Sequence, residues 1–206
     1  MNTRKLPNRL SRFLPAVIIL FGLCIVAALF LNRRIETRQS AEWESIVYSG
    51  SATNFQSSIE IAGDGPFVAQ VRNALALLSV FDPRAYAFLT SQVERIQNSD
   101  RSFAGVYERT RTVHLSKTNA MYSVTWCASA LAHEAYHFKQ WAEAAQRSRT
   151  DFQAAELEAF KYQISVMKRI RAPRYEIDYV RASDGLHGDV NGDGKYDWED
   201  FSKINW

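Results

Sequence analysis

The residues with the clearest chemical potential are two histidines and a glutamate in the sequence HEAYH at residues 133–137. On a helix, residues four positions apart lie on the same face, so His133 and His137 can direct both imidazoles at one metal ion. Glu134 is one step round the helix and reaches the position that a metal-bound water would take. Two nitrogen ligands, an open coordination position and a general base predict the site of a zinc hydrolase.

The sequence around this motif favours the helix that the spacing requires. Alanine is frequent, and neither glycine nor proline occurs from residue 125 to residue 146. Leu131, Ala135, Phe138 and Ala142 recur at helical spacing and predict the buried stripe of that helix.

A catalytic zinc ion usually takes three protein ligands, and a second predicted helix offers the third. This helix covers residues 151–171, with Asp151 as its N-cap. A turn between the two helices returns Glu156 to the metal, nineteen positions after His137. Glu158 is the alternative ligand; its other interpretation is a solvated carboxylate or a group that orients a ligand histidine.

The two motifs, HExxH at residues 133–137 and ELEA at residues 156–159, resemble those of the gluzincin metallopeptidases. In that family two histidines and a glutamate hold zinc, so the resemblance implies this role for Glu156, the first residue of ExxA. It also implies a strand before the active helix that binds extended peptide through main-chain hydrogen bonds. Residues 105–115 occupy that place, either as such a strand or as a purely structural one.

Several other side chains have less specific roles. A second hydrogen-bond donor to the oxyanion is expected, without a sequence signal that selects it. The residues considered for it are Tyr122, Tyr162, Tyr175, Tyr179 and His187. His114 is a weak ligand candidate in a predicted strand, and Cys127 is expected to be a small buried residue. Cys24 lies in an apolar run and cannot pair with Cys127, so no disulfide framework is expected.

The N-terminus has the pattern of a membrane anchor. Residues 1–12 carry four cations and no acid, residues 13–31 are uncharged and apolar, and three arginines follow within residues 33–38. The apolar run is close to the length that spans a bilayer and has no clear cleavage site, which favours an uncleaved anchor over a signal peptide. The positive-inside rule then predicts a single-pass membrane protein with its C-terminal domain on the extracytoplasmic side.

The net charge of +3 belongs to the flanks of this anchor. Residues 1–12 contribute +4 and residues 33–38 contribute +2, which leaves about −3 for residues 39–206. Nothing in the body of the chain therefore suggests a nucleic-acid surface.

A second metal motif, DVNGDGKYDWED, occupies residues 189–200. Oxygen-bearing side chains fall at positions 1, 3, 5, 9 and 12 of a twelve-residue calcium loop, with Gly194 at the sharp turn and a main-chain carbonyl at position 7. The predicted calcium ligands are Asp189, Asn191, Asp193, Lys195, Asp197 and Asp200. The alternative is an Asx-rich turn without metal.

The calcium motif resembles one loop of a dockerin or another EF-hand-like repeat. It differs in having aspartate at position 12, no convincing incoming helix and no second loop. A cohesin-type partner is therefore not expected, and a structural Ca²⁺ that fixes the C-terminal segment is the favoured interpretation.

These patterns predict an α+β protein: a minimal zincin-like domain with a small antiparallel sheet and the HExxH helix, preceded by one transmembrane helix. Helices are expected over residues 66–81 and 83–89, after the N-caps Asp64 and Asp82, and a short strand over 58–61. A hairpin or a small sheet is expected from the alternating segments 93–96 and 106–115. The predicted segments are a basic N-terminal stretch (1–12), a transmembrane signal anchor (13–31), a tether and lead-in (32–62), the metallopeptidase domain (63–181), and the calcium loop with a C-terminal helix (182–206).

The predicted function is that of a membrane-anchored zinc metallopeptidase acting on a peptide or protein substrate. The alternative is a non-catalytic, calcium-stabilised surface binding module with a structural or degenerate zinc site. Glu134 argues against that alternative, because a structural zinc site normally has four protein ligands and needs no base.

Overall fold

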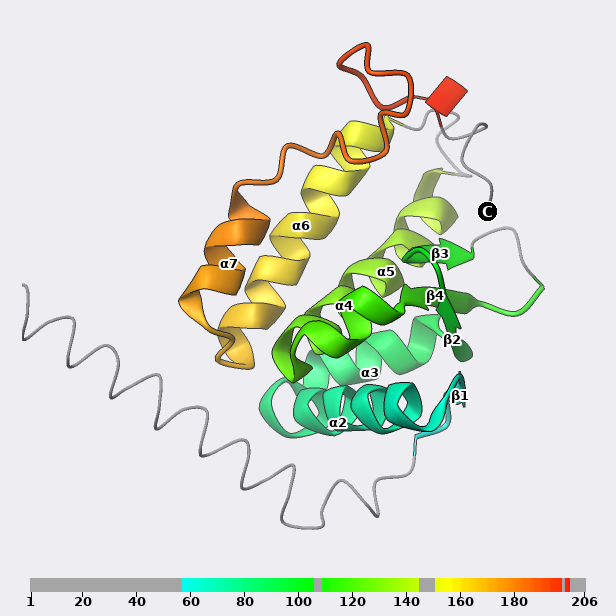
Figure 1. Cartoon of the computed structure of the whole chain (residues 1–206), viewed down its shortest axis with the longest axis vertical. Helices are drawn as coiled ribbons and strands as arrows, with labels where there is room; N and C mark the ends of the chain where they lie inside the picture. Colours follow the sequence, from blue (N-terminus) through cyan, green and yellow to red (C-terminus); the bar gives the residue numbers. More distant parts are fainter. Residues whose placement is uncertain (1–56, 106–108, 145–150, 198, 201–206) are drawn as a thin grey trace, which may run out of the picture. The chain divides into compact units, whose positions relative to one another are not determined.

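The structure, a computed structural model, describes residues 57–105, 109–144, 151–197 and 199–200 (Figure 1). Contacts divide the chain into two units, Met1–Glu44 and Ser45–Trp206, and every described residue belongs to the second. The predicted transmembrane segment, residues 13–31, lies outside the described residues, as do residues 201–206 of the predicted C-terminal helix. Within the described part of the chain, no helix is long and apolar enough to cross a membrane.

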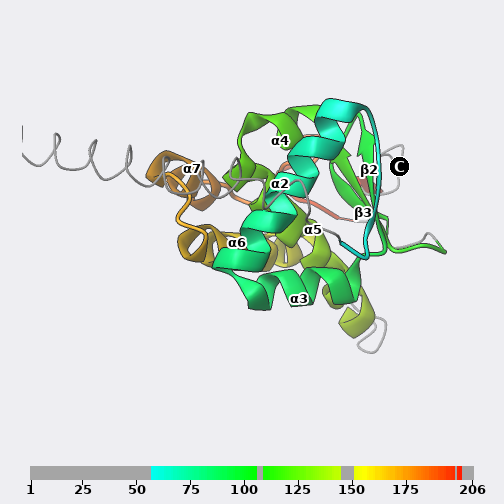
Figure 2. The same ribbon diagram turned by 90° about the horizontal axis from the view of Figure 1, so that it is seen from below.

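A four-stranded mixed sheet, ordered β1-β2-β4-β3, lies at one side of the helices (Figures 1 and 2). Its strands are β1 (Glu60–Ala62), β2 (Arg95–Ser99), β3 (Phe103–Gly105) and β4 (Thr112–Ser116). β1 and β4 both run parallel to β2, and only β3 and β4 are antiparallel. The α+β expectation holds in this coarse form, but the prediction of an antiparallel sheet is wrong.

The strand directions follow from the connections between the strands. Two helices join β1 to β2, and such a crossover brings the second strand back in the direction of the first. For residues 93–96 and 106–115, the expectation of a small sheet is confirmed, because β2 and β4 pair in one sheet, but the alternative of a hairpin is wrong. β2 and β4 are parallel, and β3 lies between them in sequence and pairs with β4 in the antiparallel direction. Alternation along the sequence identifies extended segments, but it carries no information about their partners.

The prediction for residues 105–115 also needs correction. β4 lies between β2 and β3, so it is an interior strand, and its Val113 and Leu115 are fully buried. The strand at the sheet edge near the helices is β3, which packs against the helix that carries the HExxH motif.

The first two helices start at the predicted caps. α2 (Gly65–Phe81) begins after Asp64, whose carboxylate accepts a hydrogen bond from the Phe67 amide at 2.9 Å. α3 (Pro83–Gln92) begins after Asp82 and runs three residues beyond the predicted end. Asp82 is buried and also accepts a hydrogen bond from Arg169 Nε, which ties the start of α3 to a helix far along the chain.

The HExxH motif lies on α5 (Val124–Ala144), the most buried helix of the described structure, and α6 (Phe152–Arg169) packs along it (Figure 1). Asp151 caps α6 as predicted, through a hydrogen bond from the Ala154 amide at 3.0 Å. Residues 145–150 between the two helices are not described.

Two short helices were not predicted: α4 (Lys117–Tyr122) and α7 (Arg174–Arg181). α7 is fastened to the start of α5 by Glu176, whose buried carboxylate accepts hydrogen bonds from the hydroxyls of Ser123 (2.7 Å) and Thr125 (2.8 Å). A helix of eight mostly polar residues gives little periodic signal, and this long-range pairing is what holds it in place.

Candidate metal centre

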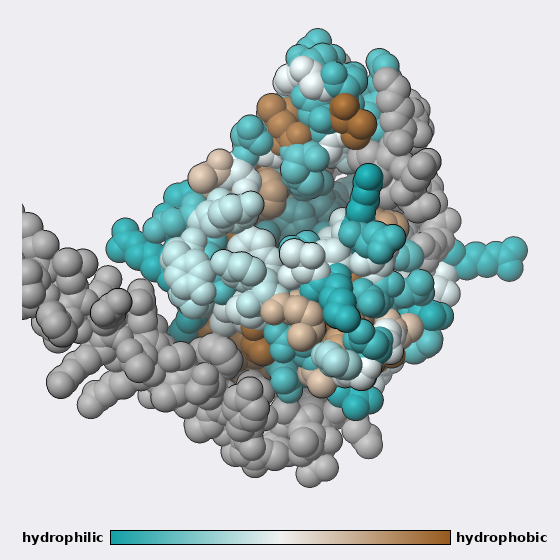
Figure 3. Space-filling model, in the orientation of Figure 1, coloured by the Kyte–Doolittle hydropathy of each residue, from teal (hydrophilic) through white to brown (hydrophobic). Residues whose placement is uncertain are grey.

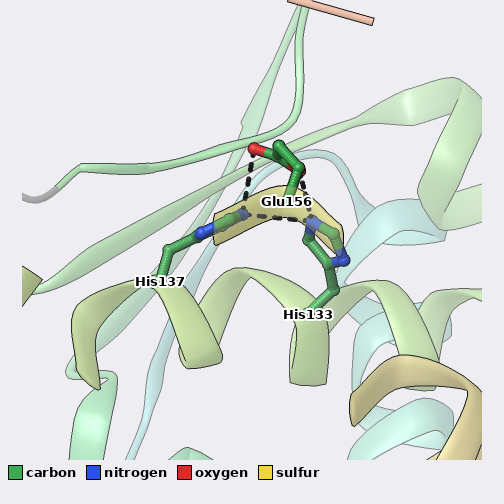
Figure 4. A group of neighbouring side chains, drawn as sticks. All are labelled: His133, His137 and Glu156. Atoms are coloured by element: carbon green, nitrogen blue, oxygen red, sulfur yellow. Dashed lines mark hydrogen bonds and ion pairs between the residues drawn. The ribbon is translucent and has the colours of Figure 1, made fainter. Parts of the chain in front are cut away.

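Three side chains from two helices converge in the part of the structure shown in Figure 4. His133 and His137 project from one face of α5, and Glu156 reaches them from α6. The Nε2 atoms of the two imidazoles are 3.1 Å apart. Glu156 Oε2 lies 3.3 Å from His133 Nε2, and its Oε1 lies 3.4 Å from His137 Nε2. One ligand atom from each residue lies within 4.8 Å of the other two, so this group could hold a metal ion.

The polar atoms of this group fit a metal ion better than they fit one another. His133 and Glu156 are buried, and Glu156 Oε2 and His133 Nδ1 are buried without a hydrogen-bond partner. Buried polar atoms normally have such partners, so a buried Glu156 oxygen without a hydrogen bond, 3.3 Å from His133 Nε2, favours a cation at this site. Two nitrogens and a carboxylate oxygen are a donor set that suits Zn²⁺.

The electrostatics of the metal-free group point the same way. Burial disfavours the charged form of His137, but the adjacent Glu156 carboxylate outweighs it and raises the imidazole pKa to about 9. Burial also disfavours the Glu156 carboxylate, yet the charge of His137 and the contacts with both imidazoles hold its pKa well below the usual range. For His133, burial prevails and lowers the pKa. The site thus stabilises one positive charge beside Glu156.

His137 is also oriented from its other nitrogen. Its Nδ1 lies 2.8 Å from Gln140 Oε1, and the Gln140 amide nitrogen donates to the main-chain carbonyl of Ala155 at 2.8 Å. This chain of contacts runs from α5 to the residue before Glu156. It fixes the ring in the way that metal-ligating histidines are commonly held.

Glu134 lies beside this group with only 8% of its surface exposed. Burial raises the pKa of its carboxyl to about 7; the charge of Glu156 also raises it, whereas His137, His187 and His114 act in the opposite direction. A buried carboxyl with a pKa near neutrality suits a general base, because it can take up and release a proton at working pH.

The metal group opens into a cleft of about 1020 Å³. Its walls come from β3, α5, α6 and the segment that follows α7, residues 183–196. Figure 3 shows the hollow on this face of the molecule, below the C-terminal segment. The group in Figure 4 is therefore open to a ligand that enters this cleft.

The segment after α7 forms the outer wall of the cleft. His187 Nε2 lies 3.6 Å from Glu156 Oε2, and the ring is 60% exposed. Tyr196 is 8% exposed and packs on Phe152, one turn before Glu156 on α6, with the ring centroids 5.4 Å apart. Gly188 allows this packing, since a Cβ there would lie 2.4 Å from the Tyr196 ring.

Tyr196 is a site residue that sequence reasoning missed. Burial raises the pKa of its hydroxyl, and the carboxylates of Glu156, Asp200 and Glu134 raise it further. The hydroxyl is therefore within electrostatic reach of the metal group and of the calcium motif. Its only sequence signal was its place inside that motif, at a loop position that supplies no ligand.

Some of the remaining predicted site residues line the cleft, and others lie away from it or do not join the metal group. Glu158 is exposed on α6 and does not join the histidines. His114 lies on β4 with its ring stacked on Phe103 at 4.2 Å, and Cys127 is fully buried, which raises its thiol pKa to about 12. Of the five residues considered for the oxyanion, Tyr179 and His187 line the cleft, whereas Tyr122, Tyr162 and Tyr175 do not.

The calcium motif adopts a compact loop with its acidic side chains turned inward onto main-chain amides. Asp189 accepts hydrogen bonds from the amides of Gly192 and Gly194, and buried Asp200 accepts from those of Val190 and Asn191. Gly194, at position 6, has a φ of 81° that favours glycine. Among the described residues, however, the acids of this loop do not form a converging ligand group of the kind seen at His133.

Comparisons of the chain with protein-family models, with curated proteins and with solved structures found no match. The interpretation of the cleft therefore depends on its own geometry and chemistry.

We predict that the full chain binds one zinc ion and that its affinity falls as the pH is lowered. His137 must lose its proton to bind metal, so below pH 9 each unit should weaken binding about tenfold. Calorimetric titration at several pH values and elemental analysis would measure this.

A matched pair of variants identifies the third ligand. Glu156→Gln should lose most of the zinc affinity, while Glu158→Gln, at the exposed neighbouring carboxylate, should bind as the native chain does. The reverse result would assign the ligand to Glu158, and a native chain without zinc would contradict the site.

Proposed function

We propose that this protein is a zinc-dependent metallopeptidase of the gluzincin type. The observation that carries the proposal is the convergence of His133, His137 and Glu156 beside buried Glu134, at the floor of an open cleft. A structural zinc site would have a fourth protein ligand and no need for this carboxylate. Among the described residues, the converging group has three members, which leaves a coordination position open.

In the proposed peptide hydrolysis, three residues bind the metal and a fourth transfers the proton. A zinc ion held by the three ligands would acidify a water and polarise the scissile carbonyl. Glu134 accepts the proton of the attacking water and passes it to the nitrogen of the leaving amine. Burial, which raises the pKa of this carboxyl to about 7 in the metal-free protein, supports its role as a base.

We assign the second donor to the carbonyl oxygen to His187. Its charge influences Glu134, its Nε2 lies 3.6 Å from Glu156, and the exposed ring faces the cleft. A group near both the base and a metal ligand can reach a carbonyl oxygen bound at the open coordination position. His187 is not part of the converging ligand group, which supports a role toward the substrate rather than the metal.

The peptide has a place to bind along β3. Phe103 and Ala104 of this strand line the cleft, and within the described residues β3 pairs only with β4. An extended substrate is therefore proposed to add along β3 through main-chain hydrogen bonds, which accept any side chain. This role replaces the one that the sequence suggested for residues 105–115.

The C-terminal loop, residues 189–200, is proposed to bind Ca²⁺. The spacing of its oxygen ligands and the left-handed backbone at Gly192 and Gly194 support a calcium loop. Such an ion would fix the segment that carries His187 and Tyr196 against α6.

The N-terminal apolar segment is proposed to anchor the protein in a membrane, with the catalytic unit on the extracytoplasmic side, where calcium is plentiful.

The alternative, a calcium-stabilised binding module with a structural or degenerate zinc site, shares both metals but needs no base. Glu134 is the residue that separates the two functions, because only hydrolysis uses a buried carboxyl of raised pKa.

We expect Glu134→Gln to lower kcat by about 10²–10⁴-fold while zinc content stays at one ion per chain, because the change removes the base and not a ligand. Hydrolysis would be followed by amine release from a mixed peptide library. Glu94→Gln, at an exposed carboxylate paired with Arg111, is the control and should leave the rate unchanged. Undiminished activity in Glu134→Gln would exclude this mechanism.

His187→Ala should lower kcat by about 10²–10³-fold through loss of an oxyanion donor, with zinc affinity retained. His187→Gln keeps a donor and should recover part of the rate. Steady-state kinetics and zinc titration on the same preparations decide the matter: a fall in zinc affinity would make His187 a ligand instead.

Calcium at 100 times its Kd should raise the free energy of unfolding by about 2.7 kcal/mol, as mass action requires for a ligand of the folded state. Thermal unfolding with calcium and with chelator would measure the shift. Asp193→Ala should abolish it, whereas Lys195→Ala should not, because position 7 contributes only its main-chain carbonyl. Equal shifts in both variants would refute the loop as the binding site.

A further inference from the structure

The cleft-facing side of α5 continues beyond the metal group toward the start of the helix. Trp126, Ala130, His133 and His137 follow one another at spacings of four, three and four residues, and all four line the cleft. This spacing keeps them on one face of the helix. Ala130 lies between the tryptophan and the metal group, and its small side chain leaves space in the cleft at that point.

An aromatic cluster closes this end of the cleft. We use that name for Trp126 of α5, Tyr179 of α7 and Tyr122 of α4. The Trp126 ring meets Tyr122 at 5.4 Å and Tyr179 at 5.6 Å, with interplanar angles of 61° and 67°. Trp126 and Tyr179 line the cleft, whereas Tyr122 supports the tryptophan from outside it.

The cluster is both rigid and accessible. The Trp126 indole nitrogen donates to Asn119 Oδ1 at 3.1 Å, and the Ser123 hydroxyl that accepts from the Trp126 amide also donates to Glu176 of α7. Tyr179 is nevertheless 69% exposed. An exposed aromatic side chain beside a fixed tryptophan, in a cleft, leaves apolar ring surface for a ligand.

We propose that the aromatic cluster is a substrate subsite that selects an aromatic side chain of the peptide, a few residues from the bond to be cleaved. This inference rests on the proposed peptidase function and names its substrate preference. The edge-to-face angles within the cluster support an aromatic occupant, because a further ring extends such an arrangement favourably. The Trp126 ring is parallel to neither of the two tyrosine rings, so these three residues do not form a flat surface for face-to-face stacking.

The position of the preferred residue follows from helix and strand geometry. Trp126 precedes His133 by seven residues, which is about 10 Å along a helix with a rise of 1.5 Å per residue. An extended peptide advances about 3.3 Å per residue, so the ring would lie about three residues from the scissile carbonyl. β3 borders the same cleft through Phe103 and Ala104, where the peptide is proposed to bind in extended form.

The test uses the zinc-loaded full chain and a set of nine-residue peptides of alanine and glycine with one phenylalanine placed at each position in turn. Phenylalanine about three residues to one side of the cleaved bond should raise kcat/KM about fivefold to tenfold, mainly through KM, as expected for one buried edge-to-face contact. Equal kcat/KM for every placement would overturn the proposal.

Variants then connect the preference to the cluster. Tyr179→Ala, at an exposed residue, should remove the preference, so that kcat/KM no longer depends on the position of phenylalanine. Trp126→Phe should retain part of the preference. Met121→Ala, at an exposed apolar residue of α4 outside the cleft, is the control and should retain all of it. A preference that survives in Tyr179→Ala would contradict the assignment.

Binding separates this inference from the proposed function. Zinc-loaded Glu134→Gln would be titrated calorimetrically with the same peptides, and this readout requires no hydrolysis. If the native chain cleaves none of them but binding still depends on phenylalanine and on Tyr179, the subsite stands and the peptidase function fails. Binding that is indifferent to phenylalanine would overturn the subsite, whatever the activity.

Discussion

Two imidazole nitrogens 3.1 Å apart in a buried site impose the constraint on which the rest of this structure depends. Unless one nitrogen carries a proton that it shares with the other, or a metal ion lies between them, their lone pairs face each other in a medium that screens poorly. In the metal-free protein, Glu156 eases this conflict, because it raises the pKa of His137 to about 9 and so favours the protonated imidazole. A metal ion would resolve it more completely, because it satisfies both nitrogens and the carboxylate at once.

This constraint requires that α5 and α6 keep their relative position. Several contacts outside the site hold these two helices in place. Asp82 caps α3 and pairs with Arg169 of α6. Glu176 of α7 accepts hydrogen bonds from two hydroxyl groups at the start of α5. Gln140 adds a direct link from α5 to the main chain before Glu156. These polar contacts join segments far apart in sequence, so they fix helix positions that apolar packing alone would leave freer.

The segment after α7 turns the metal group into a cleft. Gly188 admits the Tyr196 ring, Tyr196 packs on Phe152, and His187 then lies beside Glu156. The proposed calcium loop belongs to the same segment, so an ion there would stabilise a wall of the cleft. β3 and the aromatic cluster also line this cleft, so the proposed extended substrate would meet several surfaces.

The sequence by itself determined the local features. The HExxH helix and the caps at Asp64, Asp82 and Asp151 depend on spacing along one helix or on a cap and its first turn. For the third member of the metal group, the sequence left Glu156 and Glu158 open apart from a family resemblance, and the packing of α6 on α5 brings Glu156 to the histidines. Only the tertiary structure decided the strand order and the mixed sheet, because alternation marks a strand without naming its partner. It also decided which polar side chains face the cleft. Tyr196 and the exposed Tyr179 have no distinguishing neighbours in sequence, and they gain their roles from packing against residues more than forty positions away.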